Sequence, residues 1–391
     1  MAGLSSAYGF YVEVPGVRKE DPHEKIYFRQ VGHGPQKILL LPGNNSSGAI
    51  FNGLFNFVGG IREFKNQYTL YTVDLRGSGL SSYYQPIRDL GDFAQDILYG
   101  LDQLPYFPKE NVALAGYSMG FGVALELTYR DSARFSHLIG LAPIGTRGVR
   151  CAFNPTSQGV GPRGLKFGVH DWVPVENDEL GLDITAFQQR IWQGPARTYS
   201  TVKLIWQFLV CNETFQFDSV KMKPQDSAFE ADPFFQEAIH DIFGIRYMPE
   251  SLYYAHKMNM SGKTLEKVNS DGSKVVILGD QRLLKGAFQG KKVLLIKAQT
   301  DLTRLLGDQV IYDADMATSK YDFKIAGAQV DVAMIKPGKK YDHGFPFSMP
   351  LETLQMMDGF LQGRGQSTFD QVIGEGNYHF YPHVETQFEI N

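Results

Sequence analysis

The sequence contains only two cysteines, Cys151 and Cys211, among its 391 residues. Small secreted proteins are often held together by several disulfides, so this low count favours a reducing compartment. Neither cysteine has a Cys or His partner at the spacing of a metal site, and we therefore expect no metal and no other cofactor. Residues 1–34 also lack the long apolar run behind basic residues that marks a signal peptide. These absences lead us to expect a cytoplasmic protein.

The sequence also lacks long apolar runs and an excess of positive charge, and each absence argues against a class of function. No stretch approaches the roughly 20 consecutive apolar residues that a membrane span needs, so we expect no such span. Positive charge is not in excess, because 38 Lys and Arg stand against 42 Asp and Glu, for a formal net charge of −4. Binding to nucleic acid needs a basic face for the phosphates, which this balance argues against. We expect a small-molecule substrate, and the sequence leaves open whether the chain forms a homo-oligomer.

Apolar residues, at 43% of the chain, are sufficient for a large core. In the first half, short apolar runs such as residues 37–41 end at turn residues, which is typical of strands buried on both faces. Between them, apolar residues from Leu90 to Leu104 recur at gaps of three and four, which predicts a helix. The expected strands are 8–14, 25–31, 37–41, 68–73, 112–115, 137–141, 292–296 and 330–335, and further helices are expected near 119–130 and 350–361. This alternation predicts an α/β fold with a mostly parallel central sheet and helices on both faces.

The strand and helix pattern breaks between about Gly145 and Gly290, where the spacing is irregular and aromatic residues are dense. We interpret residues 145–290 as an inserted, mainly helical cap within a split core formed by residues 1–144 and 291–391. Helices are expected near 184–192 and 198–210. An aromatic-rich cap would line a pocket for a substrate with an apolar body, with Trp192 and Trp206 as candidate contacts. The same aromatics are equally consistent with a core of the cap itself.

The strongest chemical signal is Gly116-Tyr117-Ser118-Met119-Gly120, which matches the pattern G-x-S-x-G. A hydrophobic strand precedes it and a helical pattern follows, as a nucleophile elbow requires. In such an elbow the serine sits on a strained turn that exposes its Oγ, and the glycines allow the strand and helix to approach. The N–H of Met119, at the helix start, would then face a developing oxyanion. A plain strand-to-helix turn with a solvated serine is the alternative.

A second oxyanion donor is expected in the loop Pro42-Gly43-Asn44-Asn45-Ser46-Ser47-Gly48, which follows the third expected strand. Gly43 permits the backbone to turn, and the N–H of Asn44 would complete the oxyanion hole. Asn45 is the alternative donor. An ordinary turn rich in Asn, Ser and Gly would have the same composition.

These two motifs, together with Asp74-Leu75-Arg76-Gly77-Ser78-Gly79-Leu80-Ser81, resemble the α/β-hydrolase superfamily, in which the last segment usually reads D-x-R-G-x-G-x-S. The likeness covers roughly residues 8–145 and 290–361 and fails over the cap. Many members carry His-Gly where this chain has Pro42-Gly43, so a histidine hydrogen bond is lost while the backbone donor survives. Asp74 and Arg76 are expected to hold loops together rather than to take part in chemistry.

The resemblance also implies where the base and the acid lie, because in this family they follow the serine in the order acid, then histidine. His343 comes just past the expected strand 330–335 and before the helix 350–361, so it is the candidate general base. Asp301 follows strand 292–296 in a run similar to the family's G-x-x-D pattern, with Ala298 in place of the glycine, and is the preferred acid. The separation of Asp301 from His343 is longer than the family leads us to expect, which implies an insertion around residues 307–323. Asp308 and Asp280 therefore remain rival acids.

The sequence thus predicts a serine hydrolase with Ser118, Asp301 and His343 as catalytic residues and with Met119 and Asn44 as the oxyanion hole. Its substrate would be an ester, lactone or thioester, cleaved through an acyl-enzyme. Three other functions share this fold: an acyltransferase, a carbon–carbon bond hydrolase, and a non-catalytic member that only binds a ligand. The fold alone does not choose among them.

Overall fold

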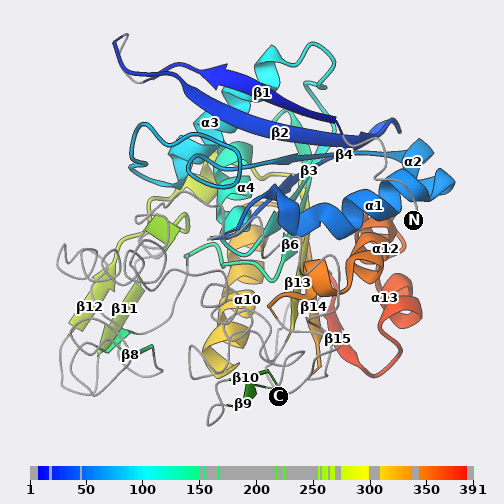
Figure 1. Ribbon diagram of the computed structural model, residues 1–391. Coiled ribbons are helices and arrows are strands. Elements are labelled where there is room, and N and C mark those ends of the chain that lie inside the picture. Colours follow the sequence, from blue (N-terminus) through cyan, green and yellow to red (C-terminus); the bar gives the residue numbers. More distant parts are fainter. Residues whose placement is uncertain are drawn as a thin grey trace.

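A nine-stranded sheet runs through the middle of the protein, as a computed structural model shows (Figure 1). The structure describes residues 8–16, 20–44, 46–148, 153–154, 166–167, 217–218, 223–224, 254–255, 258–262, 265–268, 274–298, 309–336 and 343–384. The strand order is β1-β2-β4-β3-β5-β6-β13-β14-β15. The strands are β1 (Tyr8–Val14), β2 (Glu24–Gly32), β3 (Gln36–Leu41), β4 (Tyr68–Val73), β5 (Val112–Tyr117), β6 (Phe135–Leu141), β13 (Lys292–Ala298), β14 (Gln329–Ile335) and β15 (Tyr378–Tyr381).

The six strands from β4 to β14 in this order are parallel, and antiparallel strands flank them: β1 and β2 at one edge, β15 at the other. Parallel strands need crossover connections, and these place helices on both faces of the sheet. The mostly parallel α/β sheet expected from the sequence is therefore confirmed. β6 and β13 are hydrogen-bonded neighbours although residues 142–291 separate them in the chain. The chain thus leaves the sheet after β6 and returns to it at β13.

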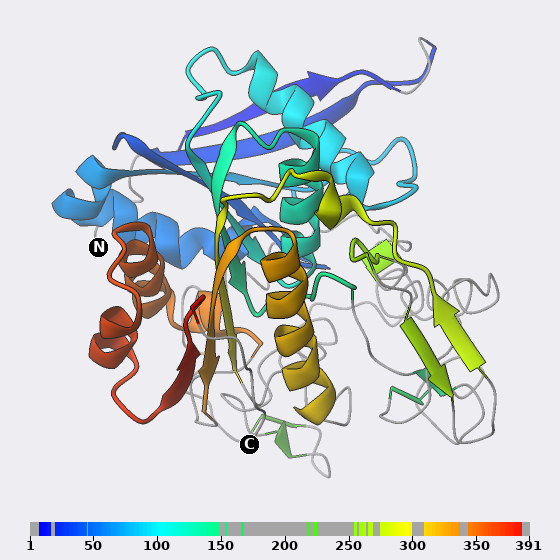
Figure 2. The same cartoon turned by 180° about the vertical axis from the view of Figure 1, so that it is seen from behind.

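Helices cover both faces of the sheet, as Figures 1 and 2 show. One face is covered by α3 (Leu90–Gln103), α4 (Met119–Arg130) and α10 (Gln309–Ile325). The other is covered by the 3₁₀ helix η1 (Gly48–Phe51) and by α1 (Asn52–Gly60), α12 (Pro350–Leu361) and α13 (Gln366–Val372). Two short helices, α2 (Arg62–Gln67) and α11 (Phe345–Ser348), complete the connections. In the described part of the chain, no helix combines the length and apolar character that crossing a membrane requires.

The central strands are buried because each face packs against its own hydrophobic cluster. In β3, Leu39 and Leu41 belong to the cluster under α3 and α4, whereas Ile38 and Leu40 belong to the cluster under α1 and α12. This alternation follows from the two-residue repeat of a strand, and it explains why the run reads as continuously apolar. Burial of this kind stabilises the fold by roughly 25 cal/mol for each Å² of apolar surface removed from water.

The structure differs from the sequence expectation after β13. The span interpreted as an insertion around residues 307–323 falls largely on α10, the crossover helix between β13 and β14. No strand or helix was expected after residue 361, but the residues that follow form α13 and then β15, which pairs with β14 as an edge strand. The sheet therefore extends one strand beyond the last one expected.

Most of the predicted cap lies outside the described residues, including both expected helices, so its boundaries at 145 and 290 stay a prediction. Inside that span the structure describes the two-residue strands β7 (Phe153–Asn154), β8 (Lys166–Phe167), β9 (Phe217–Asp218) and β10 (Lys223–Pro224), which form two pairs. It also describes the hairpin of β11 (Leu265–Val268) and β12 (Lys274–Ile277), and the 3₁₀ helix η4 (Arg282–Lys285). The segment around η4 packs on the core, since Met260, Leu283 and Phe288 are buried in the cluster under α4 and α10.

Candidate active site

Ser118 lies at the sharp turn between β5 and α4, at the carboxyl end of the central parallel strands. Its backbone has φ 52° and ψ −121°, a region that residues with a side chain rarely adopt. The turn is held on both sides: the Ser118 N–H donates to the carbonyl of Leu141 at 3.0 Å, and the Ser118 carbonyl accepts from Phe121 at 3.1 Å and from Ile144 at 3.2 Å. Strain that is fixed in this way occurs preferentially at functional sites.

The glycines of the elbow motif are needed because backbone passes directly over them. A Cβ on Gly116 would lie 2.4 Å from the Cα of Phe121, and a Cβ on Gly120 would lie 2.2 Å from the carbonyl oxygen of Leu41. The first contact is between β5 and the start of α4, and the second is between α4 and the end of β3. Both gaps are too small for any side chain.

We therefore expect Gly120→Ala to destabilise the protein by about 1–3 kcal/mol, since the new methyl group must push the backbone at Leu41 away. The measurement is the free energy of unfolding in urea. Gly60→Ala is the matched control, because the described residues place no atom within 4 Å of a Cβ at this helix end. That control should be neutral or stabilising by up to about 1 kcal/mol. Equal losses in both variants would contradict the steric explanation.

His343 follows β14 and precedes α11, and its Nε2 lies 3.1 Å from the Oγ of Ser118. The imidazole is buried, with 7% of the residue exposed, and its ring centroid lies 5.1 Å from that of Tyr117. A serine hydroxyl and an imidazole nitrogen at hydrogen-bond distance are the arrangement in which histidine can remove the hydroxyl proton. Residues that are 225 positions apart in the chain are thus brought together at the carboxyl ends of the parallel strands.

The preferred acid, Asp301, lies outside the described residues, as does its rival Asp308. Asp280 is described, and both of its carboxylate oxygens bind Arg282, at 3.0 Å to the backbone N–H and at 2.7 Å to Nε. Arg282 also contacts Glu126. Glu126 is seven residues beyond Met119 in α4, so it lies about 10 Å along the helix from the end next to Ser118. The engagement of Asp280 with Arg282 argues against it as the partner of His343. The assignment of Asp301 stays a prediction.

The 42–48 loop, which carries the second predicted oxyanion donor, passes against the elbow. A Cβ on Gly43 would lie 2.9 Å from the Cβ of Ser118, so only glycine allows the backbone to come this close. The Oγ of Ser46 donates to the Gly43 carbonyl at 3.0 Å. In a trans peptide the carbonyl of Gly43 and the N–H of Asn44 point in opposite directions, so this bond also fixes the direction of that N–H. The alternative donor, Asn45, lies outside the described residues.

Met119, the other predicted donor, is the first residue of α4. The first N–H groups of a helix have no partner within the helix and carry the positive end of its dipole, which suits a negative oxygen. The start of α4 and the 42–48 loop therefore both lie beside Ser118, and the assignment of the N–H groups of Met119 and Asn44 to the oxyanion hole stays a prediction.

Two structural contacts at the site were not predicted from the sequence. Tyr117 packs on the imidazole of His343, and its position beside the serine in the elbow motif was the available signal. Asp74 was expected to hold loops together, and it does so by accepting from the N–H groups of Gly48 and Leu80. That Gly48 is its partner in the 42–48 loop becomes visible only when β3 and β4 are known to be neighbours. The candidate substrate residues Trp192 and Trp206 lie outside the described residues. Within the described ranges, no three His, Cys, Asp or Glu side chains gather as a metal site would require.

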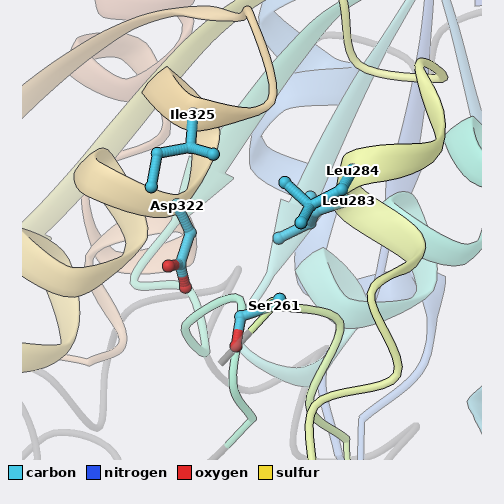
Figure 3. Close-up of a pocket in the computed structure, with 6 residues that line it drawn as sticks. Ser261, Leu283, Leu284, Asp322 and Ile325 are labelled. Carbon is cyan, nitrogen blue, oxygen red and sulfur yellow. The ribbon is translucent and has the colours of Figure 1, made fainter. Parts of the chain in front are cut away.

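A separate pocket of about 200 Å³ lies between α10 and η4 (Figure 3). Its lining residues are Ser261, Gly262, Leu283, Leu284, Asp322 and Ile325. Asp322 is not available there as an isolated charge, because its carboxylate binds Arg147 at 2.7 Å and 2.8 Å and the Thr146 hydroxyl at 2.7 Å. Neither Ser118 nor His343 lines this pocket, so we separate it from the candidate active site.

Comparison with known proteins identifies a family over most of the chain. A model of the Alpha/beta hydrolase family matches residues 38–354. Esterase FrsA of Photorhabdus laumondii is 30% identical over 78 residues, which are 20% of this chain and 18% of that protein. The matched segment thus spans less than a fifth of that relative.

Solved structures with the same fold carry different activities in their names. An esterase from Thermogutta terrifontis superposes with a TM-score of 0.53 and 16% identity, over 90% of this chain and 98% of its own. Epoxide hydrolase I from potato (Solanum tuberosum) superposes with a TM-score of 0.56 and 13% identity, over 92% of this chain and all of its own. At such low identity the likeness shows the fold alone, and the chemistry must be argued from the site.

Proposed function

Since the chain belongs to the alpha/beta hydrolase family, we propose that it is a serine hydrolase that cleaves an ester, lactone or thioester. The observation that carries this proposal is the 3.1 Å distance between the Nε2 of His343 and the Oγ of Ser118, on a strained elbow at the carboxyl end of the sheet. The esterase names of a curated relative and of a solved structure agree with it.

In the first half of the reaction, Ser118 Oγ forms a bond to the acyl carbon and its proton passes to Nε2 of His343. The oxygen of the carbonyl becomes negative and accepts hydrogen bonds from the N–H groups of Met119 and Asn44. His343 then gives its proton to the leaving oxygen or sulfur, the bond from that atom to the acyl carbon breaks, and the acyl group remains on Ser118.

In the second half, a water molecule gives a proton to His343 while its oxygen attacks the acyl carbon. The bond to Ser118 Oγ breaks, the serine recovers its proton from His343, and the acid is released. His343 needs its lone pair on Nε2 in each attacking step, so its proton must sit on Nδ1. Holding that tautomer and stabilising the imidazolium is the role we assign to Asp301.

The nucleophile type favours an acyl substrate over an epoxide, although an epoxide hydrolase shares the fold. Attack of a serine on an epoxide carbon would leave an ether on the enzyme, which water with a histidine base does not cleave. Attack on an acyl carbon leaves an ester, and the same base and oxyanion donors can hydrolyse it. The apolar body of the substrate, with Trp192 and Trp206 as contacts, is proposed from the aromatic composition of residues 145–290.

The test combines active-site labelling with an ester series. The protein is treated with a fluorophosphonate and the modified peptide is mapped, and p-nitrophenyl esters of increasing acyl length are assayed in parallel, with and without an alcohol as acyl acceptor. We expect the label on Ser118 and turnover of at least one ester to the free acid. A label on another serine, or no turnover of any ester in the series, contradicts the proposal. Product that is mainly the transferred ester would instead identify an acyltransferase.

A further inference from the structure

The carboxylate of Asp74 is buried directly after β4, with 4% of the residue exposed, and joins two loops. Its Oδ1 accepts a hydrogen bond from the N–H of Gly48 and its Oδ2 accepts one from the N–H of Leu80, both at 2.8 Å. Hydrogen bonds from backbone N–H groups to a buried carboxylate are among the stronger ones in proteins. Removing this side chain would leave two backbone donors without their acceptor.

Gly48 is the last residue of the 42–48 loop and the first residue of η1. A Cβ on Gly48 would lie 2.8 Å from Cγ2 of Thr72 and 3.0 Å from Oδ1 of Asp74, so the loop end is pressed against β4. The other end of the loop continues from β3 and touches Ser118 through Gly43. The loop is therefore held at one end by the sheet and at the other by the Asp74 carboxylate.

On the opposite side, the turn at Gly79 covers the same carboxylate. Gly79 has φ +49°, and a Cβ there would lie 2.1 Å from Oδ2 of Asp74 and 2.9 Å from the Cβ of Ser47. The hydroxyl of Ser81 donates to the Asp74 carbonyl at 2.6 Å and accepts from the N–H of Tyr27 at 2.9 Å. This turn closes over the carboxylate, which strengthens its bond to Gly48 by keeping water away.

We infer that Asp74 is a positioning residue: through Gly48 it fixes the 42–48 loop so that the N–H of Asn44 meets the oxyanion. The inference rests on the proposed function, because it assigns Asn44 to the oxyanion hole. η1 also packs against α11, the helix that starts two residues after His343, so movement of Gly48 would disturb both the donor and the base. Removing one oxyanion donor typically lowers kcat by about 10²–10³-fold. Displacing a donor that remains present should cost less, about 10–100-fold.

Glu24 provides a matched control. Its carboxylate is also buried, with 1% of the residue exposed, and its Oε1 accepts from the N–H groups of Tyr84 and Gln85 at 2.8 Å. It therefore supports the same 76–85 segment that Asp74 contacts through Leu80, but its described hydrogen bonds go to residues 82–85 and not to the 42–48 loop. Glu24→Ala and Asp74→Ala each leave two backbone N–H groups without an acceptor.

The first arm of the experiment is kinetic. The kcat and KM for a p-nitrophenyl ester, per active site titrated, are measured for Asp74→Ala, Asp74→Asn and Glu24→Ala. We expect Asp74→Ala to lower kcat about 10–100-fold with KM changed less than about threefold, because the loss lies in the transition state. The inhibition constant of a trifluoromethyl ketone, which forms an oxyanion on Ser118, should rise by the same factor. Asp74→Asn keeps one acceptor oxygen and should lose less, while Glu24→Ala should lose stability but keep kcat within about threefold.

The second arm does not depend on activity. Hydrogen–deuterium exchange of the peptide covering residues 42–51 should become faster in the Asp74 variants and stay unchanged in Glu24→Ala. If an alanine variant does not fold, Asp74→Asn and Glu24→Gln are compared instead. Unchanged exchange in the Asp74 variants overturns the inference that Asp74 holds the 42–48 loop in place. A kcat of Asp74→Ala within about threefold of wild type, or an equal loss of kcat in Glu24→Ala, overturns the positioning role. If the wild-type protein cleaves no ester, the proposed function and the oxyanion role fail together. The hydrogen–deuterium exchange rates still decide whether Asp74 holds the 42–48 loop in place.

Discussion

Replacing Ser118 with alanine is expected to lower kcat/KM for ester hydrolysis by on the order of 10⁶-fold, because the bond to the acyl carbon can no longer form. The folded structure should survive, since the strained turn is held by backbone hydrogen bonds to Leu141, Phe121 and Ile144 that do not involve the hydroxyl. An alanine at φ 52° is no more strained than the serine it replaces. The measurements are kcat/KM on the best ester, fluorophosphonate labelling and the melting temperature.

A second serine and histidine pair elsewhere in the sheet supplies the control. The Oγ of Ser136 lies 2.9 Å from Nδ1 of His137, at the start of β6, and burial lowers the pKa of His137 to about 4, helped by the nearby charges of Lys292 and Lys291. This pair has the hydrogen-bond distance between serine and histidine. It lies neither on a strand–turn–helix elbow at the start of α4 nor beside the 42–48 loop. Ser136→Ala should therefore retain wild-type activity. If Ser136→Ala abolished labelling while Ser118→Ala retained it, the nucleophile would be wrongly assigned.

The elements that the sequence predicted well are those whose burial produces a pattern of apolar residues within a short stretch of sequence. β4 and α12 have the expected bounds, and the spaced apolar residues of α3, from Leu90 to Leu101, are all buried in one cluster. Parallel strands covered on both faces must be apolar throughout, so they are visible in a short window. The elbow was visible for the same reason, because its glycines are required by contacts within one strand–turn–helix unit.

Elements that depend on distant partners were not predicted. α1 contains three glycines in nine residues, which disfavour a helix, and it is stabilised instead by Leu54, Phe55 and Val58 in the cluster under α12. β15 has only four residues and follows a turn that contains Gly374 and Gly376, and it forms by pairing with Val332 through Ile335 of β14. In both cases the deciding energy comes from tertiary packing rather than from local preference.

The candidate site divides in the same way. Ser118 and His343 followed from a motif and from chain order, and the structure places their side chains 3.1 Å apart. The contact between Asp74 and Gly48 could not be read from the sequence, because it requires β3 and β4 to be parallel neighbours with their carboxyl ends together. A buried carboxylate that binds backbone N–H groups leaves no periodic trace in the residues around it.

Replacing His343 with alanine is expected to be about as damaging as replacing Ser118, because the two groups act as a unit and neither retains much catalysis alone. Without the imidazole, the Ser118 hydroxyl must lose its proton to water, and the leaving group has no general acid. Asp301→Asn should be milder, on the order of 10⁴-fold, since it disturbs the tautomer and stabilisation of His343 without removing the base. The measurement is kcat/KM on the best ester, with circular dichroism to confirm folding.

The acid is decided by making the same substitution at its rivals. Asp280→Asn should retain activity within a few-fold, because its carboxylate binds Arg282 and so supports the contact of that residue with Glu126. The substitution should lower the melting temperature only slightly, because Asp280 is exposed. Asp308→Asn should likewise leave kcat/KM close to wild type. If Asp308→Asn inactivates the enzyme while Asp301→Asn does not, the acid lies in the segment that leads into α10, and the role of orienting His343 passes to Asp308.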